Sequence, residues 1–266
     1  MRAQGWQGSD TEEVTCCLCE IPGTVLYRMP PLAVVRCPGC GLVYVSPRPS
    51  AAALQRLYDE PAYFEDGGVY GGRGRFNPAM ALQRNWIAGR LQIVREAVPA
   101  PASLLEIGTG YGLFLSAARD LGYKTGGVEL SRTAATHARD ARGLDVYCGQ
   151  LADAPDGDLA DAVCFWDTLE HVPDPLVFLT EVRRRLAPDG TFALSVPYRS
   201  SLPARLLGRR WWTLKPEQHI WHFTPATLNT LAARAGLTIT RVCLSPALRA
   251  NLGRLDSLVA VGRARP

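Results

Sequence analysis

Three glycines alternate with other residues after a short apolar run, in a pattern that suits the binding of a small ligand. The run Leu104–Ile107 leads directly into Gly108, Gly110 and Gly112. Glycines permit tight backbone turns and let a ligand lie against the main chain. Because the turn sits between a strand-like and a helix-like segment, we expect a strand–turn–helix unit that binds a ligand at the turn.

Two glutamates accompany this turn. Glu106 stands two residues before the first glycine, and Glu129 ends the next apolar run. A dinucleotide site also uses a glycine-rich turn and a later acidic residue, but its glycines follow a G-x-G-x-x-G spacing. Glu106 would repel a phosphate and attract a cationic amino group, and Glu129 can accept hydrogen bonds from both hydroxyls of a ribose. The pattern therefore favours a nucleoside with an amino group over a dinucleotide.

Two Cys-x-x-Cys pairs near the N-terminus predict a zinc site. Cys16 and Cys19 form the first pair and Cys37 and Cys40 the second, about 17 residues further on, a spacing at which two knuckles complete a tetrahedral site. A reducing compartment disfavours disulfides, and paired knuckles fit zinc better than an iron–sulfur cluster. We expect a structural Zn²⁺ that contributes much of the module's folding free energy. Cys17 leaves a Cys17-x-Cys19 pairing open, and unligated cysteines are a further alternative.

Histidines are the candidates for proton transfer. His171 follows a buried apolar run, at the edge where open α/β sheets place ligands; a structural role there is an equal alternative. His219 and His222 would face one side of a helix or opposite sides of a strand, and either could take a proton from a hydroxyl acceptor or simply bond to the backbone under a lid. We expect His137 to be solvated. The candidate catalytic residues are His171, Tyr198, His219 and His222.

The elements that must position these residues alternate along the chain. The predicted helices are 51–59, 78–97, 113–121, 132–142, 175–186 and 225–235. The predicted strands are 103–107, 124–130, 145–148, 160–166, 191–196, 237–244 and 255–261. Near-continuous apolar strands that alternate with helices are typical of a doubly wound α/β sheet covered on both faces.

Around this core, the sequence predicts four segments. They are a flexible N-terminus (1–14), a zinc-ribbon module (15–48), a helical lid or linker (49–101) with a glycine-rich loop at 63–75, and a ligand-binding domain (102–266) that contains a lid insertion at 198–224.

Composition and charge argue against several functional classes. The 266 residues are 47% hydrophobic and 20% charged with a net charge of +4, values of a globular chain without the concentrated basic stripe of a nucleic-acid-binding protein. The polar start lacks the apolar run of a secretory signal, and no segment reaches the length of about 20 apolar residues that spans a bilayer. We expect a cytoplasmic protein with no membrane or nucleic-acid partner, and no feature favours a particular oligomeric state.

Four segments carry a resemblance to a known family. They are LLEIGTGYGLFL from Leu104, GGVELS from Gly126, FWDTLEHVPDP from Phe165 and LAPDGTFALSVP from Leu186. Over about residues 103–197 the chain resembles the class I S-adenosylmethionine-dependent methyltransferases, in particular the group with ubiquinone-biosynthesis O-methyltransferases and natural-product enzymes. The resemblance implies a Rossmann-like seven-stranded sheet whose last strand is antiparallel, and S-adenosylmethionine as the cofactor.

The resemblance also implies a cofactor site. Glu106 and the glycines would hold the methionine part, Glu129 the ribose, the loop 151–153 the adenine, and Asp167 would lie near the methionine end. The candidate cofactor-binding residues are Glu106, Gly108, Thr109, Gly110, Tyr111, Gly112, Glu129, Leu130, Leu151, Ala152, Asp153, Asp167, Thr168 and His171.

The sequence indicates only the chemical class of the acceptor. The cysteine pattern, with CPGCGLVYVSPRP and Tyr63-Phe64, resembles zinc-ribbon-bearing small-molecule methyltransferases that modify sugars and antibiotics. Arginines and tryptophans in the insertion suit an anionic, aromatic or sugar-linked acceptor, or form a solvated amphipathic helix. We expect methylation of a small metabolite, on oxygen rather than nitrogen or carbon. The alternatives are an RNA methyltransferase, although the zinc modules of ribosomal RNA guanine methyltransferases end in histidine, and a non-catalytic cofactor-binding or zinc-mediated interaction protein.

Overall fold

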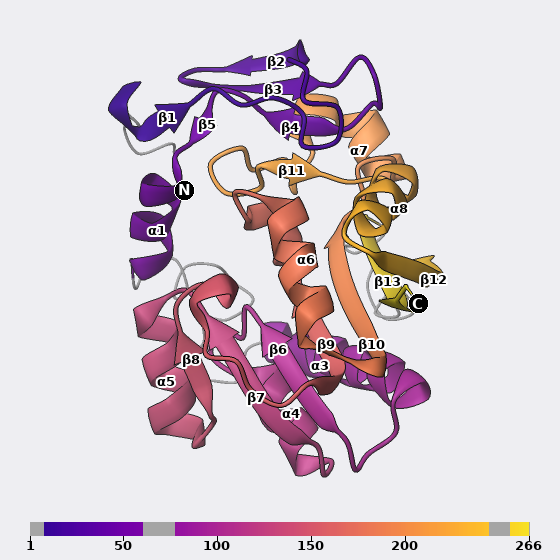
Figure 1. Cartoon of the computed structure of the whole chain (residues 1–266). Coiled ribbons are helices and arrows are strands. Elements are labelled where there is room, and N and C mark those ends of the chain that lie inside the picture. Colours follow the sequence, from indigo (N-terminus) through magenta and orange to yellow (C-terminus); the bar gives the residue numbers. More distant parts are fainter. Residues whose placement is uncertain (1–7, 61–77, 245–255, 266) are drawn as a thin grey trace.

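The computed structural model describes residues 8–60, 78–244 and 256–265. The glycine-rich loop predicted at 63–75 lies outside the described residues. Figure 1 shows a large sheet with helices packed around it, and a small sheet at the top of the view that holds the N-terminal strands.

The large sheet has seven strands in the order β12-β13-β10-β9-β6-β7-β8. Strands β6 to β10 pair in parallel, and β13, the last strand of the chain, is antiparallel to both of its neighbours. The predicted α/β fold, seven strands with an antiparallel last strand, is confirmed. The strands are β6 (Ser103–Ile107), β7 (Lys124–Glu129), β8 (Val146–Cys148), β9 (Ala160–Trp166), β10 (Leu186–Pro197), β12 (Leu237–Leu244) and β13 (Ser257–Ala264).

Helices cover both faces of this sheet. Along β9, Val163 and Phe165 belong to an apolar cluster shared with α6 and α8, whereas Cys164 and Trp166 belong to a second cluster shared with α3 and α4. Alternate residues of a strand point to opposite faces, so a strand buried on both faces must be apolar throughout. The helices are α1 (Ala51–Asp59), α3 (Pro78–Ala97), α4 (Leu113–Asp120), α5 (Arg132–Arg142), α6 (Pro175–Arg185), α7 (Leu202–Leu207) and α8 (Pro225–Arg234).

Local capping explains where the helices near the sheet's carboxyl edge begin. The Ser131 side chain accepts a hydrogen bond from Ala134 N at the start of α5, and Asp174 accepts from Leu176 N and Val177 N at the start of α6. Such caps satisfy amides that have no partner within the helix. Two short 3₁₀ turns, Leu151–Asp153 (η2) and Leu169–His171 (η3), follow β8 and β9.

The small sheet has the order β11-β4-β3-β2. Three strands come from the cysteine module, which we define as residues 15–48: β2 (Thr24–Met29), β3 (Leu32–Arg36) and β4 (Val43–Val45). The fourth, β11 (Trp221–His222), comes from the lid insertion. The sequence left open whether the stretch around His219 and His222 is helical or extended. The structure shows that Trp221 and His222 are extended and pair with β4.

Residues 8–14 differ from the flexible terminus that the sequence suggested. Gly8–Asp10 forms a 3₁₀ turn (η1), and β1 (Thr11–Glu12) pairs antiparallel with β5 (Arg48–Pro49). The Glu12 carboxylate accepts from Arg48 Nε at 2.8 Å. A polar segment is ordered here because its charge and its backbone groups find partners on the module.

None of the helices in the described ranges combines the length and the apolar character needed to cross a bilayer.

Candidate cofactor and acceptor site

The glycine turn lies between β6 and α4, and its geometry requires glycine. Gly108, Gly110 and Gly112 have φ of 75°, 52° and 74°, in the left-handed region that other residues disfavour. A Cβ at Gly108 would stand 2.6 Å from Thr168 Oγ1 and one at Gly112 would stand 2.4 Å from Leu144 Cδ1. The turn is therefore held at the carboxyl edge of the sheet in a close-packed conformation that side chains at Gly108 and Gly112 would prevent.

Glu106 is a buried carboxyl group that faces this turn. Its side chain is only 3% exposed, and Oε2 has no hydrogen-bond partner among the described residues. Burial raises the pKa of Glu106 well above its ordinary value, although the nearby Arg90 guanidinium opposes this. A buried acceptor without a donor is costly, so this carboxylate fits a ligand that brings a cationic amino group.

Arg90, on α3, brings a positive charge to the same pocket. It is 3% exposed, and its guanidinium lies 3.0 Å from the ring centroid of Trp86. Its Nη2 donates to Asp167 Oδ2 at 2.7 Å and to Ser195 Oγ at 2.9 Å. Sequence reasoning missed Arg90, because nothing in the pattern of α3 shows which polar residue turns inward. The residues that line the pocket are Trp86, Ile87, Arg90, Glu106, Gly108, Thr109, Leu113, Phe114 and Trp166.

Asp167 completes this end of the site. Its φ of 49° is left-handed, and its Oδ1 accepts from Ser195 Oγ at 2.9 Å. A non-glycine residue in this region is a strained feature that clusters at functional sites. The structure thus places Asp167 beside Arg90, at the end of the site opposite to Glu129.

Glu129 ties the glycine turn to the end of β7. Its Oε2 accepts from Gly110 N at 2.7 Å and its Oε1 accepts from Ser131 N at 2.8 Å. Burial raises the pKa of Glu129, and the bonds from the Ser131 and Gly110 amides oppose the rise. Each carboxylate oxygen has two lone pairs, so both retain an acceptor position for a ligand hydroxyl. The rings of Tyr111 and His137 contact each other in a tilted arrangement, with centroids 4.4 Å apart. His137, which the sequence suggested to be solvated, is half-buried.

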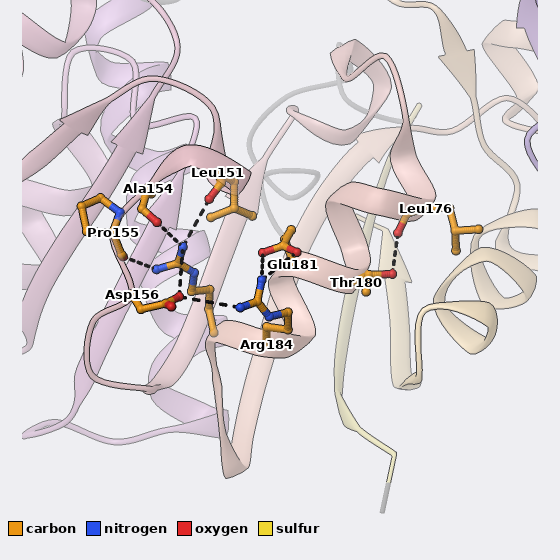
Figure 2. A network of polar contacts seen from close by, with 9 residues as sticks. Leu151, Ala154, Pro155, Asp156, Leu176, Thr180, Glu181 and Arg184 are labelled. Atoms are coloured by element: carbon orange, nitrogen blue, oxygen red, sulfur yellow. Dashed lines mark hydrogen bonds and ion pairs between the residues drawn. The ribbon is translucent and has the colours of Figure 1, made fainter.

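The 151–153 turn is fixed by the carboxyl end of α6. Arg185 Nη2 donates to the carbonyls of Leu151 at 3.3 Å and Ala154 at 2.6 Å, and Nη1 donates to Pro155 O at 2.5 Å. Figure 2 shows these carbonyls turned toward the α6 end, next to the pair of Arg184 with Glu181. Leu151 is buried, whereas Ala152 and Asp153 are exposed. The η2 turn therefore has a defined position at the edge of the sheet, beyond the end of β8.

Comparison with known proteins decides the family. The family model described as "Methyltransferase domain" matches residues 80–242. The chain belongs to the methyltransferase domain family. We call residues 80–242 the methyltransferase domain.

Relatives and neighbours agree with this membership. The ubiquinone biosynthesis O-methyltransferase of Cereibacter sphaeroides is 33% identical over 148 residues, which cover 50% of this chain and 59% of that protein. The chain thus spans little more than half the length of this curated relative. The Burkholderia thailandensis 1,6-didemethyltoxoflavin-N1-methyltransferase, solved with S-adenosylhomocysteine, has a TM-score of 0.61 at 19% identity and covers 91% of this chain and 99% of its own. The magnesium protoporphyrin IX methyltransferase of Synechocystis has a TM-score of 0.61 at 16% identity, with 82% and 100% covered.

Beyond the carboxyl end of β9, Glu170, His171 and His219 come together. One ligating atom of each lies within 4.8 Å of the others, and the His171 and His219 rings meet edge to face at 4.7 Å. Both carboxylate oxygens of Glu170 are buried and have no partner among the described residues. Burial lowers the pKa of His171 to about 4 and lowers that of His219 well below its ordinary value. Burial raises the pKa of Glu170 well above its ordinary value. Two neutral imidazoles and a carboxyl group can share a proton or hold a divalent cation.

The other two candidate catalytic residues lie elsewhere. His222 is 1% exposed with neither ring nitrogen bonded within the described chain, and its ring lies 6.0 Å from that of Trp211. Burial lowers the pKa of His222 to about 3. Tyr198 is half-buried, and its amide donates to Asp256 O. His222 nevertheless contributes through its charge to the lowered pKa of His219.

The cysteine module brings its four predicted ligands together. The Sγ atoms of Cys16, Cys19, Cys37 and Cys40 all lie within 4.8 Å of one another, and Cys17 is not among them. A tetrahedral zinc with Zn–S bonds of about 2.3 Å holds sulfurs about 3.8 Å apart, so the four thiols fit the ion.

The buried state of Glu106 leads to a prediction about protons. Because burial raises its pKa in the empty protein, a ligand ammonium that requires the ionised form must displace a proton. Binding of S-adenosylhomocysteine is therefore expected to release protons, and to tighten as the pH rises between the ordinary glutamate pKa of about 4.3 and the raised value. Calorimetry in buffers of different ionisation enthalpy measures this release. Glu106→Gln should reduce it but not abolish it, because burial also raises the pKa of Glu129. A release that is unchanged in that variant would contradict the assignment.

Proposed function

We propose that this chain transfers a methyl group from S-adenosylmethionine to a small-molecule acceptor, with oxygen as the favoured acceptor atom. The observation that carries the proposal is that the Glu106 carboxyl group and the Arg90 guanidinium line one pocket together with the glycine turn. An amino acid presents an ammonium and a carboxylate a few ångströms apart, and this pair is complementary to both. The methyltransferase names of the relatives and neighbours support it.

The chain's own residues hold the cofactor in this proposal. Glu106 accepts from the ammonium, Arg90 donates to the carboxylate, and the bare main chain of the glycine turn supports the methionine part. Glu129 accepts from the two ribose hydroxyls, and the 151–153 turn lies by the adenine. When bound, the cofactor supplies a methyl group on a positively charged sulfur, which is already activated toward a nucleophile.

We assign proton removal to His219, at the end of the site where the acceptor would bind. His219 Nδ1 lies 2.7 Å from the carbonyl of Thr213, so Nδ1 carries the proton and Nε2 the lone pair. The lowered pKa keeps the ring neutral at pH 7. His219 can therefore take the hydroxyl proton of the acceptor while the oxygen–carbon bond forms and the carbon–sulfur bond breaks. His171 and Glu170 lie beside His219.

The acceptor class is narrowed by the lid insertion. Trp211 is buried and donates to Asp256 Oδ2 at 2.7 Å, so its ring supports the lid rather than a ligand. Arg205, Arg209 and Arg210 are exposed and face solvent. We therefore favour a small hydroxylated acceptor, aromatic or sugar-linked, over a strongly anionic one. The four-cysteine cluster is proposed to hold a structural Zn²⁺.

Transfer of label tests this function. With methyl-labelled S-adenosylmethionine and a cell metabolite extract, the protein is expected to move label into a small molecule. His219→Gln is expected to lower the rate by about 10²- to 10⁴-fold, the range of general base catalysis, whereas His222→Gln should lower it only slightly if it still folds. Binding of S-adenosylhomocysteine by both variants is the control. No label in any small molecule would refute the function, and full activity of the His219 variant would remove this base.

A further inference from the structure

The cysteine module and the methyltransferase domain share a β-sheet. In the lid insertion, Trp221 pairs with Tyr44 and His222 pairs with Val43 across β11 and β4. Strand β4 directly follows the second cysteine knuckle, in which Cys37 N donates to Leu42 O at 2.8 Å. The knuckle therefore determines where β4 runs, and β4 determines where β11 runs. Figure 1 shows β11 at the edge of the small sheet, between β4 and the helices of the domain.

Main-chain hydrogen bonds continue from this sheet to the acceptor end. Val45 N, in the module, donates to Ile220 O at 3.0 Å, and Ile220 N donates to Glu170 O at 2.9 Å. Ile220 follows His219 directly and is fully buried, so water cannot replace these bonds. Two hydrogen bonds thus connect the module backbone to the segments that carry Glu170 and His219.

Two side chains strengthen the same connection. Arg48 is 7% exposed, its Nη1 donates to Pro173 O at 2.9 Å, and its guanidinium lies 5.5 Å from the ring centroid of Trp221. Trp221 Nε1 donates to Val172 O at 2.9 Å. Val172 and Pro173 immediately follow His171. One residue of the module and one of the lid therefore hold the chain just past that histidine.

We propose that Arg48 and Trp221 are positioning residues, through which the cysteine module sets the geometry of Glu170, His171 and His219. The inference rests on the proposed function, in which these groups face the acceptor. The hydrogen bonds of Arg48 and Trp221 go to Glu12, Val172 and Pro173, whereas Glu106 and Glu129 lie at the ends of β6 and β7. Disturbing the connection should therefore affect the acceptor end and spare the cofactor end.

The test uses the full-length, zinc-loaded protein with Arg48→Gln and, in case that variant fails to fold, Trp221→Phe, which keeps most of the packing but loses Nε1–H. Both should keep the affinity for S-adenosylhomocysteine and the zinc content, and lose about 10- to 100-fold in transfer rate, because an ångström of misplacement has that effect. Backbone hydrogen exchange should rise at 168–173 and 217–222 but not at 104–112. Arg48→Lys should restore part of the rate. The matched control is Arg28→Gln, since this arginine of the module is exposed.

Two results would overturn the proposal. One is that backbone hydrogen exchange and the methyl-transfer rate are both unchanged in the two variants. The other is that affinity for S-adenosylhomocysteine falls as much as the transfer rate does, which would indicate a general loss of structure. The exchange measurement needs no acceptor, so it decides the coupling by itself. Absence of transfer by the wild-type protein would count against the proposed function instead.

Discussion

Glu129→Ala is expected to weaken the binding of S-adenosylhomocysteine by about 100-fold or more. The Glu129 carboxylate already accepts from Gly110 N and Ser131 N, and in the proposed site it also accepts from two ribose hydroxyls. Hydrogen bonds to a charged group contribute about 1.5–3 kcal/mol each, and 1.4 kcal/mol is a factor of ten in affinity. Removing this group loses both ligand bonds and loosens the turn that lies under the ligand. Isothermal calorimetry measures the change.

Two variants separate this effect from a general loss of stability. Glu129→Gln keeps the shape and an acceptor oxygen, so it should bind more weakly than the wild type but better than Glu129→Ala. Asp140→Ala removes an exposed carboxylate on α5 and should bind normally. Wild-type affinity in folded Glu129→Ala protein would mean that this carboxylate does not hold the ligand.

Cys37→Ser is expected to lose the bound zinc and to unfold the cysteine module. Structural zinc contributes about 10–16 kcal/mol of apparent binding free energy in zinc-finger peptides. Cys16 and Cys37 are themselves buried, so loss of a ligand removes the ion and disturbs the packing around it. We expect zinc content to fall from one equivalent to near none, and Tm to fall by roughly 10 °C or more, since 1 kcal/mol corresponds to about 2–4 °C in a chain of this size. Metal analysis and calorimetric melting are the measurements.

Cys17 provides the matched control. It adjoins Cys16 but lies outside the cluster of four sulfurs, so Cys17→Ser should retain zinc and melt like the wild type. Loss of zinc from Cys17→Ser, with retention by Cys16→Ser, would exchange the roles of these two neighbours. Retention of zinc by Cys37→Ser would contradict the site.

The sequence predicted the parts of the molecule that depend on local pattern. The strands around Glu106 and Glu129 are short apolar runs that end in turn residues, and the φ values of the three glycines follow from the same motif. The cysteine cluster could be predicted equally well from the sequence, because the spacing of the ligands within a knuckle is a local feature. Strand ends were less accurate: β10 begins at Leu186 rather than at 191, and β13 runs over Ser257–Ala264.

What the sequence missed depends on contacts between distant segments. Strand β11 is two residues long and pairs with a strand far away in the chain, so no periodic pattern of apolar residues predicts it. Arg90 is one of several polar residues on α3, and only packing against Trp86 and Asp167 shows that it is buried. The meeting of His219 with His171 likewise depends on how the insertion folds back over β9. The division of roles between His219 and His222 was left open by the sequence. We favour His219 because its ring lies with Glu170 and His171.

The most direct test of the account is calorimetry on zinc-loaded wild-type protein titrated with S-adenosylhomocysteine. The account predicts saturable binding of one molecule per chain, accompanied by proton release and strongly reduced in Glu129→Ala. Absence of heat with both S-adenosylhomocysteine and S-adenosylmethionine, in protein whose folding is verified by its melting transition, would contradict it.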